Sequence, residues 1–333
     1  MKQKITLWKI ILIIVLVIAA FVGYNIYKFN SLNSNVELFS TSSNSKSKFI
    51  GVISNDYYKL EDDRLKGFKQ DNNLLFDIEA KDIADIVYDK YIYIIKNDGS
   101  ISSIDRHTGE EKRNTKLDSK PVKSQYIDKE LIIYCEDSII ILSNKLSTLK
   151  EINGINNPIS FSQSGKDYSL IELNQKDNNI NSRFTISNGE ENSFNLFSSD
   201  EVFLRTKIMG DNIILLSNRY LYLIEDNSIL KKKFFVNITA VDINKDKIAI
   251  VNDKELIVFD KNLEEISRRD LGREIDKVKI LNNSIFLLSK DKAIVYENEN
   301  ILEDGISEWL DWYTRDNEFY IIFENKIQRV NAY

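Results

Sequence analysis

The chain has very few of the residues on which several classes of protein depend for cross-links and chemistry. Its 333 residues include one cysteine, Cys135, and one histidine, His107. A single cysteine cannot form an intrachain disulfide, so the fold does not depend on such bonds. A single histidine excludes metal sites built from several histidines and leaves any Ser/His/Asp triad dependent on one residue in a polar turn. We expect His107 to fill a turn and Cys135 to be a small buried residue.

Glycine and proline are also scarce, with 11 and 2 residues. This composition excludes collagen-like chains and proline-rich disorder. No glycine-rich phosphate loop is present, and the acidic stretches Leu60–Arg64 and Lys176–Asn181 lack the spacing, the glycine and the terminal glutamate of a calcium loop. The sequence therefore predicts no cofactor, no metal ion and no catalytic residue.

Positive charge is concentrated at the N-terminus. The net charge is −6, but the first 28 residues carry four lysines and no acid, which leaves −10 for the rest of the chain. A body of this sign repels a phosphate backbone, so nucleic acid is not an expected partner. The mean hydropathy of −0.30 also argues against a protein with several membrane spans.

One long apolar segment runs from Ile5 to Tyr27, interrupted only by Lys9 and Asn25. As a helix its 23 residues would span ~34 Å, enough to cross a hydrocarbon core of ~30 Å. A cleaved signal peptide is the alternative, because the uncharged run Ile10–Gly23 has the length of an h-region. Since no polar cleavage region follows that run, we expect an uncleaved anchor.

The lysines around this segment predict its orientation. Lys2, Lys4 and Lys9 come before or at its start, and only Lys28 follows closely. The positive-inside rule then places the N-terminus in the cytoplasm and the body outside the cell membrane. The expected organisation is a stub and single-pass anchor at 1–28, a Ser/Asn-rich tether at 29–48 with strand character at 36–40, and one folded body at 49–333.

The body consists of a repeat, of which Lys90–Glu111 is the clearest copy: an apolar strand, an Asn-Asp-Gly turn, a second strand and a Thr-Gly turn. Each copy begins with an apolar residue after a polar pair, and the starts are 34 to 45 residues apart. They are Tyr57, Tyr91, Leu131, Tyr168, Ile213, Ile248, Ile285 and Phe319. A period near 40 with strands and no helices indicates a β-propeller.

Within the clearest copy the pattern predicts four strands, which make one blade. We place them at 85–88, 91–95, 100–104 and 110–114. Apolar runs such as those around Ile132 and Ile214 fit strands that are covered on both faces by neighbouring blades. A pair of β-sandwiches or an irregular β-solenoid is the alternative fold.

The last copy has only three strands before the chain ends, and an unpaired blade edge invites aggregation. If residues 36–40 supply the missing outer strand, the propeller has eight blades, and the two ends of the chain share one of them. Seven blades remain the alternative if the first copy is not a true blade. The predicted fold is therefore all-β, an eight-bladed or alternatively seven-bladed β-propeller after one transmembrane helix.

One segment resembles a known family. Residues Ser103–Glu110 read SIDRHTGE and are similar to the core of the PQQ-like repeat. The resemblance implies an eight-bladed propeller, as in quinoprotein dehydrogenases and in non-catalytic relatives that include an envelope assembly lipoprotein. The chain also resembles membrane-anchored propellers of clostridial type. The family's quinone chemistry does not follow, because several of those dehydrogenases use a vicinal cysteine pair that this chain cannot form.

Three local features are candidate binding sites. Residues 308–313 hold two of the three tryptophans, and strand alternation would place Trp309, Asp311 and Tyr313 on one face, where they could contact a partner. Lys231–Lys233, followed by two phenylalanines, and the pair Arg268–Arg269 are basic segments on expected outer strands. Packing between blades is the other interpretation of the tryptophans, and protection of blade edges is that of the basic segments.

These observations favour a non-catalytic, membrane-anchored propeller that acts as a protein-interaction scaffold in the cell envelope, with an envelope protein as partner. A ligand- or glycan-binding sensor built on Trp309 and Tyr313 is the alternative. A PQQ-type enzyme is the third hypothesis. The sequence does not specify a small ligand.

Overall fold

The computed structural model describes residues 36–40, 48–53, 56–69, 71–176, 179–188, 193–198, 201–297, 300–306, 309–315, 318–323 and 326–331. These residues form strands and turns, with no helix among them. The predicted transmembrane segment at 5–27 lies outside the described residues. Within the described ranges, no helix has the length and apolar character needed to cross a bilayer.

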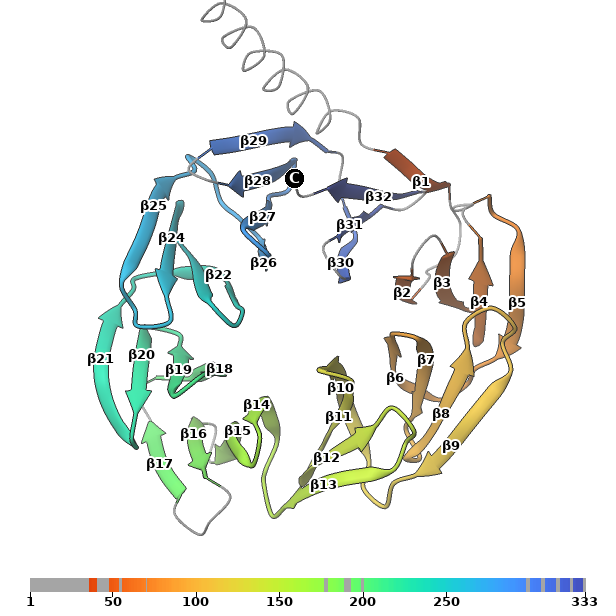
Figure 1. Ribbon diagram of the computed structural model, residues 1–333, viewed down its shortest axis with the longest axis horizontal. Coiled ribbons are helices and arrows are strands. Elements are labelled where there is room, and N and C mark those ends of the chain that lie inside the picture. The colour runs from red at the N-terminus through yellow and green to blue at the C-terminus, as the bar shows by residue number, and fades with distance from the viewer. Residues whose placement is uncertain are drawn as a thin grey trace, which may run out of the picture. The chain divides into compact units, whose positions relative to one another are not determined.

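The strands form eight four-stranded sheets, and the fold is an eight-bladed β-propeller (Figure 1). The propeller prediction is confirmed, and the seven-bladed alternative is wrong because the first copy forms a complete sheet. All eight predicted copy starts lie in or at the start of the second strand of a sheet. The repeated pattern of an apolar strand followed by a polar turn therefore predicted the number of blades.

The chain divides into two compact units, and the longer one covers residues 42–280. It contains six complete sheets. Their strands are β2 (Lys48–Ile53), β3 (Asp56–Glu61), β4 (Arg64–Phe68), β5 (Leu74–Glu79); β6 (Ile83–Tyr88), β7 (Tyr91–Lys96), β8 (Ser100–Asp105), β9 (Glu111–Lys116); β10 (Pro121–Ile127), β11 (Glu130–Cys135), β12 (Ser138–Ser143), β13 (Thr148–Asn153); β14 (Pro158–Ser164), β15 (Asp167–Lys176), β16 (Asn179–Ser187), β17 (Ser193–Ser198); β18 (Phe203–Met209), β19 (Asn212–Ser217), β20 (Tyr220–Glu225), β21 (Ser228–Phe234); β22 (Ile238–Ile243), β23 (Lys247–Asn252), β24 (Glu255–Asp260) and β25 (Glu265–Asp270).

The shorter unit covers residues 1–41 and 281–333, and the boundary falls at the end of β26. All of β26 (Lys277–Leu281) except Leu281 belongs to the longer unit, and its sheet continues with β27 (Ser284–Leu288), β28 (Lys292–Glu297) and β29 (Asn300–Gly305) of the shorter unit. The other sheet of the shorter unit contains β1 (Val36–Ser40), β30 (Asp311–Arg315), β31 (Glu318–Ile322) and β32 (Lys326–Asn331). β1 pairs antiparallel with β32, so a strand from each end of the chain belongs to the same sheet.

The clearest copy of the repeat shows why these residues fold into a blade. Its four strands are β6 to β9, close to the predicted ranges, and they pair in antiparallel order. Gly99 and Gly109 have φ angles of 84° and 73°, in the left-handed region that the two turns require. The Asp105 carboxylate accepts hydrogen bonds from the backbone N–H groups of His107 and Thr108. The turn residues thus set the strand register.

Apolar packing between neighbouring sheets forms the core. The two middle strands of a blade are buried on both faces, as in β19 and β20 against β23 and β24. One cluster joins these two sheets; it includes Ile214, Leu216, Leu221, Leu223, Ile248, Ile250, Ile257 and Phe259. Each such side chain contributes roughly 1.5–3 kcal/mol when fully buried. The continuous apolar runs in the sequence exist because a blade interior has no solvent face.

The first strand of each sheet is an edge strand, and in the longer unit side chains of the preceding sheet satisfy some of its N–H groups. The Asp85 carboxylate in β6 accepts from the backbone N–H and the hydroxyl of Ser124 in β10, both at 2.7 Å. Ser160 in β14 accepts from the Thr206 N–H in β18 at 3.0 Å. These contacts join inner strands that share no backbone ladder.

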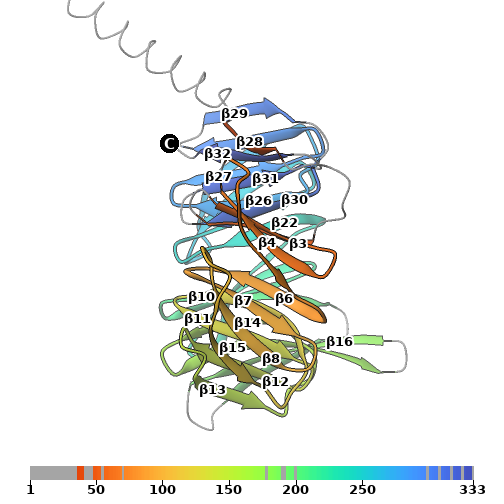
Figure 2. The same cartoon turned by 90° about the vertical axis from the view of Figure 1, so that its right-hand side faces the viewer.

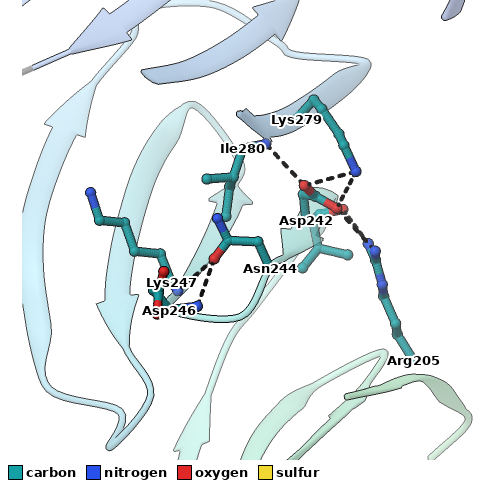
Figure 3. A network of polar contacts seen from close by, with 8 residues as sticks. Arg205, Asp242, Asn244, Asp246, Lys247, Lys279 and Ile280 are labelled. Carbon is teal, nitrogen blue, oxygen red and sulfur yellow. Dashed lines mark hydrogen bonds and ion pairs between the residues drawn. The ribbon is translucent and has the colours of Figure 1, made fainter. Parts of the chain in front are cut away.

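The same arrangement recurs at Asp242, the most buried of these carboxylates (Figure 3). It lies in β22, is 3% exposed, and accepts from the Ile280 N–H in β26 at 2.9 Å. Arg205 donates to it at 2.9 Å, and the Lys279 Nζ lies 3.3 Å from its other oxygen. One carboxylate therefore links three inner strands of the longer unit.

The fourth sheet in chain order contains one long hairpin. Its strands β15 and β16 have 10 and 9 residues, and the tip of β16 projects beyond the surrounding strands (Figure 2). The sheet keeps the four-stranded order of the others.

Gly109 and Gly154 have the same φ angle of 73°, so alanine substitutions at these two positions distinguish backbone strain from steric crowding. A Cβ on Gly109 would lie 2.8 Å from Phe76, whereas a Cβ on Gly154 would have no neighbour within 4 Å. We predict that Gly154→Ala lowers the free energy of unfolding by about 1 kcal/mol, the cost of a left-handed alanine. Gly109→Ala should cost roughly 1–3 kcal/mol more, because the methyl group overpacks the core.

Urea unfolding of the full-length chain, followed by circular dichroism, measures both free energies. Equal losses in the two variants would mean that the Thr-Gly turn does not pack against β5.

Candidate functional site

The predicted site around Trp309 lies in the shorter unit, and its tryptophans are partly buried against a core cluster. Trp309 precedes β30, packs against the cluster that contains Phe286 and Phe319, and donates its indole N–H to the Ser289 carbonyl at 2.8 Å. Trp312 packs against the same cluster, with its ring 5.5 Å from that of Phe319. Blade packing therefore accounts for the contacts of both side chains.

Strand alternation was wrong for Trp309. The strand begins only at Asp311, so the alternation rule does not apply two residues earlier. Asp311 is exposed and accepts from the Trp312 N–H at 2.8 Å, and Tyr313 lies 6.2 Å from the ring of Tyr320. Asp311 and Tyr313 occupy alternate positions of β30 and share a face of the strand, whereas Trp309 lies outside it. Their role in partner binding stays a prediction.

The local environments of the single histidine and the single cysteine account for these two residues without a catalytic or metal-binding role. The His107 Nδ1 lies 3.5 Å from the Asp56 carboxylate at an exposed turn. The backbone N–H of His107 is the main reason that the pKa of Asp105 is held below its usual value. Cys135 is 1% exposed in β11, and burial raises the pKa of its thiol, which makes it a poor nucleophile.

The basic segment Lys231–Lys233 lies on the outer strand β21, as predicted, and its lysines contact the protein itself. Lys231 forms an ion pair with Glu264 and donates to the Asn262 carbonyl. The ammonium of Lys232 lies 3.6 Å from the ring centre of Tyr220, and that of Lys233 lies 5.0 Å from the ring of Phe259. These contacts hold β21 against β20 and the next sheet.

Apolar side chains of the same segment point into solvent. Leu230, Phe234 and Val236 are 52%, 61% and 74% exposed. We call these three residues, together with Ile229, the β21 surface. β21 is the terminal strand of its sheet, so one of its backbone edges has no partner strand. Exposed apolar side chains on an open strand edge are typical of surfaces that bind another chain.

In the other basic segment on an outer strand, Arg268–Arg269, the first arginine is paired with acidic neighbours. Arg268 in β25 donates to Glu255 and Glu265, each at 2.9 Å, and this pairing with Glu265 raises the pKa of its guanidinium. The group is exposed, so the pairs stabilise the blade edge only slightly.

Sequence reasoning missed the charged residues of the inner strands. Arg205, Asp242 and Lys279 meet in the contact of Figure 3, although 37 residues separate Asp242 from each of the other two. A signal was present: these residues interrupt otherwise apolar first strands of successive copies. Among the described residues, no group of three or more His, Cys, Asp or Glu side chains is arranged to hold a metal ion.

Comparison with known proteins supports the fold. No family model matches the chain, and no curated protein matches it. The computationally designed Ika8 protein is similar, with a TM-score of 0.61, 13% identity, and coverage of 89% of this chain and 99% of the designed one.

Two natural proteins have similar folds. Sqt1 from Saccharomyces cerevisiae has a TM-score of 0.57 and 10% identity, and covers 89% of this chain and 100% of its own. BamB from Moraxella catarrhalis has a TM-score of 0.56 and 11% identity with the same coverage. At these identities the likeness concerns the fold alone.

Trp309 and Leu310 are adjacent residues with opposite environments, which gives a matched test. We predict that Trp309→Ala lowers the free energy of unfolding by roughly 2–4 kcal/mol, because it removes a packed ring and leaves the Ser289 carbonyl without its donor. Leu310, which is 66% exposed, should tolerate alanine within about 0.5 kcal/mol. Chemical denaturation of the full-length chain tests this. A Trp309→Ala variant as stable as wild type would return Trp309 to the list of surface binding residues.

Proposed function

We propose that the protein is a non-catalytic scaffold of the cell envelope, anchored in the membrane by residues 5–27, whose extracytoplasmic β-propeller binds a partner protein. A β-propeller fold is consistent with a protein-interaction scaffold. A rigid stack of blades offers loops and strand edges for contact and needs no reactive side chain for this task.

The observation that carries the proposal is the β21 surface. Three large apolar side chains within seven residues are more than half exposed. The lysines between them contact neighbouring residues of the blades, so they do not shield this apolar surface as free charges would. Burying these side chains against a partner would gain about 25 cal/mol per Å² of apolar area.

The proposed location rests on the sequence. The apolar run from Ile5 to Tyr27 is long enough for one membrane span, and the lysines before it favour a cytoplasmic N-terminus. The resemblance to BamB concerns the fold alone. A ligand-sensing role for Trp309 and Tyr313 has less support, because Trp309 packs into the core.

Photo-crosslinking from the β21 surface tests the interaction. A photoreactive amino acid placed at Phe234 in the full-length chain should yield a discrete crosslinked band in cells, and Leu230→Ser with Val236→Ser should reduce it at least tenfold. Phe197 in β17 is 68% exposed and serves as the control position, since it lies on another blade. Equal crosslinking from both positions, or none from Phe234, contradicts the proposal.

Because the single cysteine is buried, cysteine labelling can test the location of the propeller without background labelling of the wild type. Wild type should not react with a membrane-impermeant maleimide because Cys135 is 1% exposed. A Lys254→Cys variant, changed at an exposed position, should be labelled in intact cells once any outer permeability barrier is opened. Labelling only after the cell membrane is broken would place the propeller in the cytoplasm.

A further inference from the structure

A basic cavity lies between the inner strands of the longer unit. Its volume is about 570 Å³, and residues of β10, β14, β18, β22 and β26 line it. The charged side chains in its wall are Lys123, Arg205, Lys207, Lys245, Lys279 and Asp128. With the buried Asp242 behind Arg205 and Lys279, the site has five cations and two carboxylates, a net charge of +3. The whole chain has a net charge of −6, so this concentration of positive charge is local.

The cations differ in how far the protein itself neutralises them. Arg205 and Lys279 share the single carboxylate of Asp242, as Figure 3 shows, which leaves one positive charge between them. Lys245 is 87% exposed and lies 3.9 Å from Asp246. Neither Lys123 nor Lys207 has a hydrogen-bond acceptor or a carboxylate partner within the described part of the chain. The ammonium of Lys123 rests 5.7 Å from the ring of Tyr134.

Lys207 is the cation of this cavity that a bound anion would stabilise most. It is partly buried in β18, and burial is the main cause that lowers the pKa of its ammonium, with Arg205 and Lys279 adding repulsion. Asp128 and Asp242 oppose this shift without forming an ion pair with it. A partly buried cation among other cations is an unfavourable arrangement that an anion in the cavity would relieve.

Several neutral polar groups of the cavity wall already have partners. Thr206 donates its N–H to Ser160 and its hydroxyl to Ser169, and Gln125 donates to the Tyr134 hydroxyl at 2.6 Å. The strongest donors in the wall are therefore its charged groups, above all the ammonium groups of Lys123 and Lys207. A site of this kind selects for charge, and it does not discriminate by a pattern of neutral donors and acceptors.

A neighbouring cavity shows that the excess of positive charge is confined to the larger cavity. It has a volume of about 380 Å³ and shares Lys207 and Asp128 with the basic cavity, but its other charged residue is Glu130. Two carboxylates and one ammonium give that cavity a net charge of −1, so an anion would enter only the larger cavity.

We propose that the basic cavity binds a small anion carrying two or more phosphoryl groups. A carboxylate brings one negative charge, whereas a phosphoryl group brings about 1.5 to 2 and three strong acceptor oxygens. Two phosphoryl groups match the charge of +3, and the volume suits a small molecule. An acidic peptide would need three side chains in the same cavity to match it. This ligand site is distinct from the β21 surface, and neither proposal depends on the other.

The test uses sodium tripolyphosphate as the probe. Isothermal titration at low ionic strength, with the full-length chain in a neutral detergent, should show one equivalent bound per chain. Lys207→Gln and Lys123→Gln should each weaken binding about tenfold or more, since each removes a charge-assisted contact. Lys145→Gln, at an exposed turn outside both cavities, should bind like wild type. Raised salt should weaken binding in every variant that retains it.

Further variants and probes keep the outcome decisive. Lys207→Arg should retain binding, and unfolding curves confirm that each variant is folded; Lys123 is exposed, so its substitution leaves the core intact. Competition by dihexanoylglycerol pyrophosphate, whose headgroup has two phosphoryl groups, below its micellar concentration would identify a lipid headgroup as the natural source. Its failure to compete would identify a soluble phosphorylated ligand instead. The proposal is overturned if wild type binds no tripolyphosphate, if both lysine variants bind it unchanged, or if poly-aspartate binds more tightly.

Discussion

The inner strands of the propeller impose the constraint on which the rest of the longer unit depends. Each is an edge strand with backbone N–H groups that face no neighbouring strand, and an unsatisfied buried N–H costs about 1–3 kcal/mol. Side chains of the preceding sheet accept from these groups, as Asp85 does from Ser124 and Asp242 does from Ile280. The first strands therefore carry polar residues at positions where a fully packed strand would be apolar.

This constraint also produces the site. A buried acceptor such as Asp242 needs positive neighbours, and Arg205 and Lys279 supply them from the strands on either side. Once cations occupy the inner strands, the space between those strands becomes positive even in an acidic chain. The apolar packing of the middle strands and the polar bridging of the inner strands thus divide the blade into a core that holds the fold and an inner rim that can bind a ligand.

The sequence predicted the blades well because the relevant signals are local. An Asn-Asp-Gly turn, a left-handed Gly109 and runs that are apolar on both faces each specify a few residues, and eight repetitions made the architecture visible. Strand alternation failed at Trp309 because that residue precedes β30 and reaches the Ser289 carbonyl from outside the strand. The basic cavity could not be predicted, since Lys123, Lys207 and Lys279 meet only after several blades have packed together. The isolated lysines in otherwise apolar strands were the feature of the sequence that indicated this cavity.

The claim that most needs a direct observation is that the inner rim is an anion site. A crystal structure of the full-length chain soaked with tungstate, a heavy analogue of phosphate, would locate the anion by its anomalous scattering. The account predicts a tungstate peak in the basic cavity within hydrogen-bond distance of the Lys207 ammonium, with Lys123 turned toward it. Tungstate bound only at lysines on the outer strands, with the cavity free of it, would contradict the account.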